Sequence, residues 1–162
     1  MQPLDPDARP QLSVLDRLFD DQPDEKREVP PNRFQAVRAY RAAVLRDLEW
    51  LLNSRANPEQ ATDEFPTLRD SSYSYGLPDL SSLRVSSEGD QTKLKQAIKS
   101  AIELHEPRLS NLAIEVGDDF TKTKLKLNFK VTALLNMSPE PEQVSFDTEF
   151  DVSRGSYQVK GG

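Results

Sequence analysis

The chain has 162 residues, 36% hydrophobic and 30% charged, and its 21 basic and 27 acidic residues give a net charge of −6. The length predicts one domain of ordinary size. With no cysteine and one histidine, the sequence excludes disulfides, iron–sulfur clusters, zinc ribbons and poly-histidine metal sites, so we expect neither a metal nor a cofactor. The acidic balance argues against sequence-independent nucleic-acid binding. No apolar run is long enough to cross a bilayer and the first residues lack a signal-peptide pattern, so we expect a soluble, cytoplasmic protein.

Residues 1–32 are predicted to form a flexible N-terminal arm, because they are rich in proline and acidic residues and lack a periodic pattern. One short helix is expected near residues 13–19, where Ser13 precedes a small apolar face and can cap the helix. An isolated helix of this length is marginal in water. It must therefore dock on its own domain or on a partner.

The strongest helical pattern covers residues 33–54, with Asn32 as its N-cap. Its apolar residues follow the helical period. They are Phe34, Val37, Tyr40, Val44, Leu45, Leu48, Leu51 and Leu52. Arg41 projects into this stripe, and Trp50 projects from the opposite face beside three alanines. We therefore predict a helix that is covered on two sides, with a partly exposed Trp50 as the alternative.

Residues 55–91 are divided by proline and glycine into turns, yet they contain many apolar residues, among them Leu80 and Leu83, which indicates a loop packed over a core. A short helix is predicted around residues 67–75. A second clear amphipathic helix is predicted over residues 92–105, and Pro107 ends it because the residue before a proline is pushed out of the helical region.

Alternating apolar residues then predict strands over 112–116, 125–131 and 144–152, and a hairpin turn over 153–156 leads into a last strand. Helices followed by antiparallel strands are typical of the α+β class. We therefore predict N-terminal helices packed on a C-terminal antiparallel β-meander of three to four strands. Residues 33–160 are expected to form this single domain.

The residues give little support for an enzyme. His105 lies on the apolar face of a predicted helix near its C-terminus, where a packed structural ring is the simpler interpretation. The acidic pairs Asp118–Asp119 and Glu140/Glu142 lie in predicted hairpin loops, where such side chains are usually just solvated. We therefore expect no catalytic residues and no enzymatic activity.

The segment Glu106–Pro107–Arg108 has two interpretations. Proline fixes its backbone, and residues two apart in an extended segment face the same way. Glu106 and Arg108 would then present a carboxylate and a guanidinium side by side on a rigid spacer. The alternative is a helix stop with two surface charges, which a three-residue pattern taken by itself favours.

The edges of the predicted sheet are a second candidate for binding. An open meander leaves unpaired backbone groups at its edges, and such edges accept a strand from another chain. Lys124, Lys126 and Lys130 are instead typical of protection against that pairing. The sequence leaves both interpretations open.

Four segments, in this order, resemble the TssE family, the small baseplate subunit of the bacterial type VI secretion system. They are Leu15-Asp16-Arg17-Leu18, the helix ending Val44-Leu45-Arg46-Asp47-Leu48-Glu49-Trp50-Leu51-Leu52-Asn53-Ser54-Arg55, Tyr75-Gly76-Leu77-Pro78-Asp79-Leu80 and His105-Glu106-Pro107-Arg108-Leu109. Two departures are small: Ser54 stands where the family usually has threonine, and residues 71–74 lack the common SVxN pattern. The same superfamily includes the baseplate wedge protein of contractile phage tails, once labelled a tail lysozyme.

The resemblance implies a structural, non-enzymatic subunit of the baseplate wedge, at the cytoplasmic face of the inner membrane. The implied partners are the wedge subunits TssF, TssG and TssK and the sheath proteins TssB and TssC, with neither nucleic acid nor membrane insertion. The sheet would template the contractile sheath by strand exchange. Glu106, Pro107 and Arg108 match the family's assembly motif and are implied to bind partners.

Two further segments are assigned roles alongside this motif. Leu15, Arg17 and Leu18 are expected to bind a partner from the short helix, and the segment Tyr75, Gly76, Leu77, Pro78 and Asp79 is expected to form a structural turn. A second branch of the superfamily keeps two of the four segments. Its members are anti-adaptors that bind a response regulator, and this regulatory function is the alternative.

Overall fold

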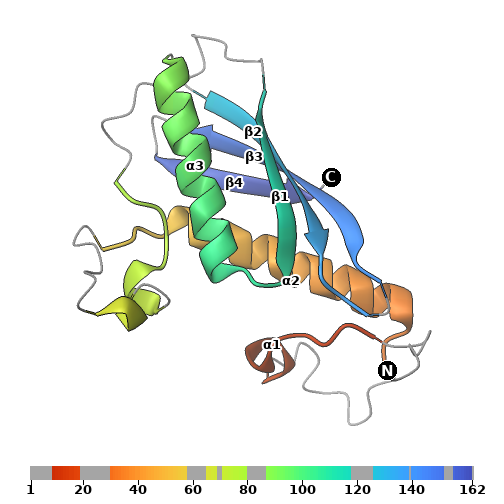
Figure 1. Cartoon of the computed structure of the whole chain (residues 1–162). Helices are drawn as coiled ribbons and strands as arrows, with labels where there is room; N and C mark the ends of the chain where they lie inside the picture. Colours follow the sequence, from red (N-terminus) through yellow and green to blue (C-terminus); the bar gives the residue numbers. More distant parts are fainter. Residues whose placement is uncertain are drawn as a thin grey trace.

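The fold is α+β, with two long helices in the middle of the chain followed by four strands (Figure 1). The computed structural model describes residues 9–18, 30–57, 65–68, 71–79, 87–117, 126–138, 140–151 and 155–161. Its elements in chain order are α1 (Val14–Leu18), α2 (Arg33–Asn53), the 3-10 turns η1 (Pro66–Leu68) and η2 (Ser72–Ser74), α3 (Glu88–His105), β1 (Leu109–Val116), β2 (Lys126–Leu135), β3 (Glu142–Asp151) and β4 (Ser156–Gly161). The α+β class is confirmed, but the main helices span 33–105 and are mid-chain rather than N-terminal.

The sheet is an antiparallel meander with strand order β1-β2-β3-β4. The β2–β3 pairing is regular along its whole length, from Lys126 opposite Asp151 to Leu135 opposite Glu142. The β1–β2 pairing is interrupted by a bulge between Ser110 and Ala113. The predicted strand positions are therefore confirmed, with four strands in the described part of the chain.

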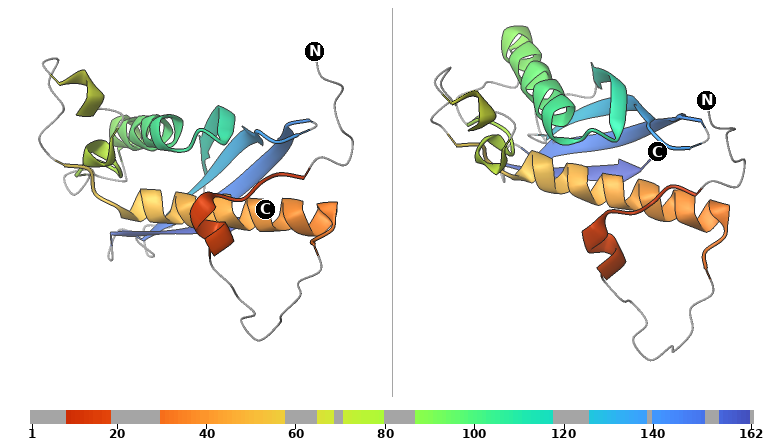
Figure 2. Two further views of the ribbon diagram at one scale, coloured as in Figure 1. Left: turned by 90° about the horizontal axis from the view of Figure 1, so that it is seen from below. Right: turned by 60° about the horizontal axis from the view of Figure 1, so that its bottom comes forward.

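One face of the sheet forms the core. Alternate residues of β2 are buried, and they pair with buried residues of β1 and β3 on the same face. Those of β2 are Leu127, Phe129, Val131, Ala133 and Leu135. Helix α3 packs on β1, and α2 packs on β4 and contacts α3, so both helices cover this face (Figure 1, Figure 2).

Helix α2 begins where the sequence predicts, because Asn32 forms a capping box with Gln35. The Asn32 side chain accepts from the Gln35 N–H at 2.9 Å, and the Gln35 side chain accepts from the Asn32 N–H at 2.8 Å. Most of the predicted stripe from Tyr40 to Leu52 is buried, Leu45 is half-buried, and Phe34 is 88% exposed and does not belong to it. Arg41, which the sequence places in this stripe, is half-exposed and forms an ion pair with Glu142 of β3.

The second predicted cover of α2 is only partly present. Ala36 and Ala43 are buried, whereas Trp50 is 59% exposed, as the alternative interpretation expected. The cover on this side is the segment 9–18, which lies along α2 in both views of Figure 2. An ion pair between Asp16 and Arg46 links the two elements.

Two boundaries differ from the predictions. Helix α3 begins at Glu88 rather than at residue 92, so it is one turn longer than its apolar pattern. The predicted helix around 67–75 is wrong: η1 and η2 are separate 3-10 turns. Because Ser71 caps η2 by accepting from the Tyr73 N–H, it starts a new turn instead of continuing a helix.

Some predictions fall outside the described residues. They concern the tail 1–8, the linker 20–29, Leu80 and Leu83, the pair Asp118–Asp119 and most of the hairpin turn 153–156. Within the described ranges, no helix has the length and apolar character that a membrane crossing requires.

Candidate functional site

The turn that joins α3 to β1 is fixed on both of its sides. Glu106 ends α3, with its N–H donating to the Ile102 carbonyl at 2.9 Å. On the far side, the Asn136 N–H donates to the Arg108 carbonyl at 2.8 Å, and the Asn136 side-chain amide donates to the Pro107 carbonyl at 3.2 Å. The backbone of Glu106–Pro107–Arg108 is therefore held between the end of α3 and the end of β2.

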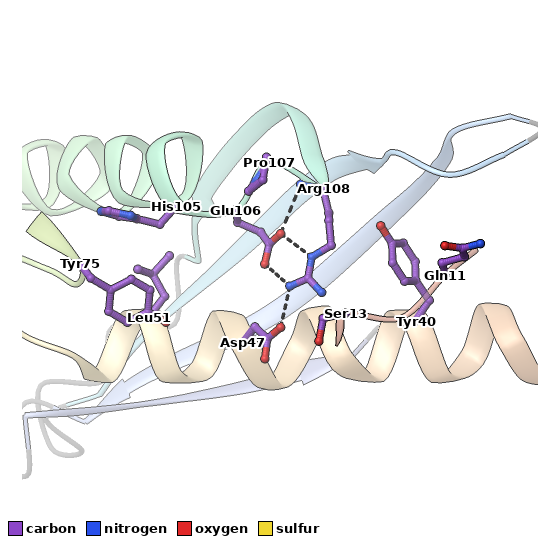
Figure 3. A pocket seen from close by; sticks show the side chains of 10 residues that line it. All are labelled: Gln11, Ser13, Tyr40, Asp47, Leu51, Tyr75, His105, Glu106, Pro107 and Arg108. Carbon is purple, nitrogen blue, oxygen red and sulfur yellow. Dashed lines mark hydrogen bonds and ion pairs between the residues drawn. The ribbon is translucent and has the colours of Figure 1, made fainter. Parts of the chain in front are cut away.

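Glu106 and Arg108 lie side by side and bind each other, as Figure 3 shows. Glu106 is only 4% exposed. Its Oε1 accepts from Arg108 Nε at 2.6 Å and from the Arg108 N–H at 3.3 Å, and its Oε2 pairs with Arg108 Nη2. This bidentate contact, together with Asp47, raises the pKa of Arg108 above its ordinary value. The helix ends at this turn as the alternative interpretation expected, but Glu106 is not a surface charge, because it is buried and paired with Arg108.

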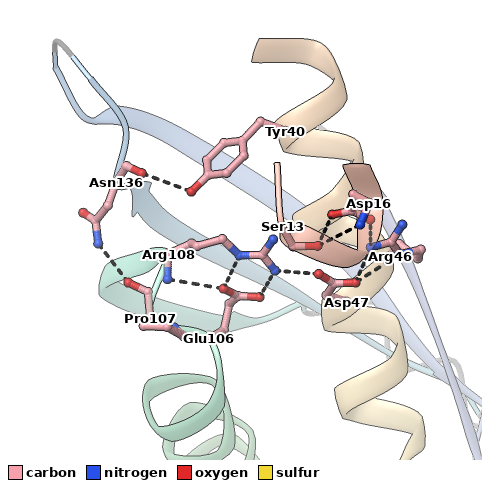
Figure 4. Close-up of polar contacts among 9 residues, drawn as sticks. All are labelled: Ser13, Asp16, Tyr40, Arg46, Asp47, Glu106, Pro107, Arg108 and Asn136. Carbon is pink, nitrogen blue, oxygen red and sulfur yellow. Dashed lines mark hydrogen bonds and ion pairs between the residues drawn. The ribbon is translucent and has the colours of Figure 1, made fainter. Parts of the chain in front are cut away.

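A chain of charged side chains continues from Arg108 across α2 (Figure 4). Arg108 Nη2 donates to Asp47 Oδ2 at 2.7 Å, and Asp47 Oδ1 accepts from Arg46 Nε at 3.0 Å and Nη2 at 2.8 Å. Arg46 Nη2 then lies 2.7 Å from Asp16 Oδ1 on α1. We call Asp16, Arg46, Asp47, Glu106 and Arg108 the charge network.

The outer end of the charge network holds α1. The Ser13 hydroxyl, which caps α1, lowers the pKa of Asp16 most, and Arg46 adds to this effect. The bonds to Asp47 and then to Asp16 raise the pKa of Arg46. The Arg46 guanidinium also lies 4.9 Å above the centre of the exposed Trp50 ring.

A pocket of about 480 Å³ opens between the arm, α2 and the α3–β1 turn (Figure 3). Its lining residues are Gln11, Ser13, Tyr40, Asp47, Leu51, Tyr75, His105, Glu106, Pro107 and Arg108. The Tyr40 hydroxyl donates to the Asn136 carbonyl at 3.3 Å, and burial raises the pKa of Tyr40, so this hydroxyl stays neutral. The charge network thus borders a concave surface with both polar and apolar walls.

His105 has a structural environment at the rim of this pocket. Its Nε2 lies 3.0 Å from the Ser74 carbonyl oxygen, and its ring meets Tyr75 edge-on at 5.3 Å. The described residues contain no cluster of three His, Asp or Glu side chains arranged to hold a metal ion. Of the two acidic residues predicted in a hairpin loop, Glu140 is exposed. The prediction is wrong for Glu142, which is the first residue of β3 and pairs with Arg41.

The segment Tyr75–Asp79 packs on the end of α2. Gly76 has φ +114°, and a Cβ there would lie 2.5 Å from the Ser54 carbonyl oxygen, so only glycine fits. The Leu77 N–H donates to the Ser54 carbonyl at 2.9 Å, and Arg55 pairs with Asp79 at 3.1 Å. Pro78 is exposed.

The family model of the baseplate wedge protein gp25 matches residues 38–140 of this chain. The chain belongs to this family. Among curated proteins, none matches the chain. The gp25 match covers α2 from Arg38 onward, α3, β1 and β2, and so includes four members of the charge network: Arg46, Asp47, Glu106 and Arg108.

The structure brings together only some of the residues that the sequence singled out. Glu106, Pro107, Arg108 and Tyr75 line one pocket. Leu15 and Leu18 of α1 are 70% and 74% exposed, and Arg17 is exposed too. They lie on the short helix that Asp16 attaches to α2, but they do not line the pocket.

Sequence reasoning missed the role of Asp16, Arg46 and Asp47. A signal was present for Asp47, which lies three residues after buried Val44 and four before buried Leu51, so it shares their helix face. An acidic residue on a buried face is rare unless it is paired. Nothing in the local pattern of Asp16 or Arg46 reveals that they meet.

Proposed function

We propose that this gp25-family protein is a structural, non-enzymatic subunit of the type VI secretion baseplate wedge. In this proposal it joins the wedge subunits TssF, TssG and TssK to the first ring of the sheath proteins TssB and TssC, at the cytoplasmic face of the inner membrane. The observation that carries the proposal is the gp25 match, which spans the helices and the Glu106–Pro107–Arg108 turn. The TssE-like segments in the sequence favour a secretion system over a phage tail.

We propose that two parts of the chain bind different partners: an arm, residues 1–32, and a body, residues 33–160. The arm contributes Leu15, Arg17 and Leu18, whose exposure leaves them free to meet a wedge subunit. The body contributes Glu106, Pro107 and Arg108 to a second wedge contact. Since Glu106 and Arg108 neutralise each other within the chain, the turn offers a fixed shape rather than a free charge.

Sheath templating requires a sheet edge with free backbone groups. The Tyr157 N–H and carbonyl bind the side chain of Asn53, both at 2.9 Å, so they point away from β3. In an antiparallel ladder this direction alternates, and the backbone groups of Gln143 and Ser145 on β3 therefore point toward the line of β4. The last described pair of that ladder is Phe146 with Gly161.

A groove of about 350 Å³ lies at this edge. It is lined by Arg41, Ala42 and Leu45 of α2 together with residues 143–146 and Gly161. The other edge, β1, carries the bulge at Ser110–Ala113, a device that blunts edge pairing. We therefore propose that the sheath strand adds to β3 in line with β4, beside α2.

A tagged-protein pull-down from the native cytosol, read by mass spectrometry, tests the function as a whole. We expect recovery of the wedge subunits together with TssB and TssC. Recovery of a response regulator without them would instead support the anti-adaptor function and would reject the baseplate proposal.

The strand site is tested by replacing one backbone donor. Gln143→Pro removes an N–H that points toward the line of β4 and leaves the β2–β3 ladder bonds in place, so we expect sheath assembly in cells to fail while the wedge still forms. Gln143→Ala keeps the N–H and is the matched control. Val116→Pro removes a donor from the β1 edge instead, and failure of sheath assembly only in that variant would move the strand site to β1.

A further inference from the structure

Arg108 uses only part of its guanidinium within the chain. Nε and Nη2 are bound by Glu106 and Asp47, whereas Nη1 has no hydrogen-bond acceptor among the described residues. Figure 3 and Figure 4 show this free end directed toward Ser13 and the space beside Tyr40, which is the interior of the pocket. Two N–H groups are therefore presented in a fixed direction to whatever enters the pocket.

The charges around Arg108 Nη1 determine whether a charged or a neutral acceptor can bind to it. The charge network contains three carboxylates, on Asp16, Asp47 and Glu106, and two guanidinium groups, on Arg46 and Arg108. Both oxygens of Glu106 and of Asp47 already accept from arginine. An added anion would meet a site that is negative overall, whereas a neutral acceptor gains the two N–H groups without that repulsion.

Asp47 is placed so that it can set the orientation of the Arg108 guanidinium. It lies on α2, whereas Glu106 and Arg108 both belong to the α3–β1 turn. The 2.7 Å bond from Arg108 Nη2 to Asp47 Oδ2 is therefore the contact that ties the guanidinium to a different element, α2. Arg46 holds the other oxygen of Asp47 and so fixes the rotation of the carboxylate.

We propose that Asp47 is a positioning residue of the partner-binding site, and that it directs Arg108 Nη1 to bind a main-chain carbonyl of a wedge subunit in the pocket. This inference rests on the proposed wedge function and names the chemistry of the contact. A main-chain carbonyl is an uncharged acceptor, and every loop of a partner protein contains such groups. It therefore meets the requirement for a neutral acceptor. Asp47 acts through Arg108 and does not itself touch the partner.

The first test uses the free protein with 15N-labelled arginine. In solution NMR, the rotation that exchanges Nη1 and Nη2 of Arg108 is expected to be several-fold faster in Asp47→Ala than in the unsubstituted chain. Glu49→Gln changes another carboxylate two residues away on α2 and is expected to leave the rotation unchanged. An equal rotation rate in Asp47→Ala would overturn the positioning role, whether or not a partner binds.

The second test measures the affinity of each full-length variant for a purified complex of TssF and TssG. We expect Asp47→Ala to weaken binding about tenfold, the order of one charge-assisted hydrogen bond. Asp47→Asn keeps an oxygen that accepts from Nη2 and is expected to recover most of the affinity. If the partner group were a carboxylate, removing the charge of Asp47 would tighten binding, and that result would overturn the neutral acceptor.

Controls separate the possible failures. Thermal melts identify folded variants, and if Asp47→Ala does not fold, Asp47→Leu, which has a similar size but no acceptor oxygen, replaces it: weaker binding supports the proposal, and equal or tighter binding overturns it. Unchanged affinity in a folded Asp47→Ala, with the unsubstituted chain binding normally, would overturn this contact alone. Absence of binding by the unsubstituted chain would overturn the proposed function and this contact together.

Discussion

At the scale of single residues, the role of each glycine follows from its surroundings. Gly76 has φ +114° and lies against the backbone of Ser54, whereas Gly89 is in helix α3, where an added Cβ would lie 3.8 Å from Ser87 Oγ, an ordinary van der Waals contact. The first position requires glycine for two independent reasons, the backbone angle and the close approach. The second requires neither, and glycine within a helix carries an entropic cost.

Alanine substitutions should therefore have opposite effects at these two positions. Gly76→Ala forces a Cβ to within 2.5 Å of a carbonyl oxygen at an unfavourable φ, and we expect the free energy of unfolding to fall by more than about 2 kcal/mol. Gly89→Ala should leave it unchanged or raise it by up to about 1 kcal/mol. Chemical denaturation of both variants checks this, and similar losses in the two would contradict it.

The residue scale also shows how far the sequence predicts the site. The Glu106–Pro107–Arg108 turn can be found because proline after a helix is a local signal, and the spacing of Glu106 and Arg108 makes a side-by-side arrangement one of two possible interpretations. Asp47 cannot be assigned to the same site from the sequence, because 61 residues separate it from Arg108. Only the packing of α2 beside the end of α3 brings the two together.

At the scale of elements, the end of α2 is joined to β4 by one side chain. Asn53 donates to the Tyr157 carbonyl and accepts from the Tyr157 N–H. Its side-chain amide therefore makes the two hydrogen bonds that a residue of a neighbouring antiparallel strand would make. This contact satisfies two backbone groups at an edge of the sheet that would otherwise be free. It also fixes the angle between a helix and a strand that are distant in the sequence.

Removing this amide should loosen the edge of the sheet. Asn53→Ala leaves the Tyr157 backbone without these partners, and we expect a loss of about 1–3 kcal/mol in the free energy of unfolding. Hydrogen exchange of the Tyr157 amide should also become faster. Asn128→Ala, which truncates an exposed asparagine on β2, is the matched control and should change neither quantity.

The elements themselves were largely predictable, for physical reasons. Alternating apolar residues locate the strands, because one face of the sheet is buried and the other is exposed. The start of α2 is encoded by a capping box, whereas the first turn of α3 holds no apolar residue and so carries no periodic signal. The 3-10 turns escape prediction because three residues are too few to show a period.

At the scale of the whole molecule, the arm and the body are joined by few contacts. No residue of α1 is buried, and α1 is too short to be stable on its own. The ion pair between Asp16 and Arg46 and the partial burial of Leu12 against the core are the described contacts that hold the arm. Docking of the arm should therefore respond to the charge of Asp16.

This response has a defined direction in pH. The pKa of Asp16 is lowered from its ordinary value of 3.8, so its contribution to docking is fully present above that value and is lost as the pH falls through the lowered pKa. Trp50 is the only tryptophan and lies under Arg46, so its fluorescence should report the change. In Asp16→Asn this acid transition should be absent; an identical transition in that variant would contradict the assignment.

The link between Asn53 and Tyr157 spans 104 residues, and it has a consequence for how the protein is made. During synthesis, α2 leaves the ribosome long before β4 exists, so the apolar face of α2 has no β4 to pack against. Strands β1 to β3 can pair as successive hairpins, but the layer formed by α2 closes only when β4 arrives. Until then the nascent chain carries an uncovered apolar helix face, which makes it a client for chaperones that bind such surfaces.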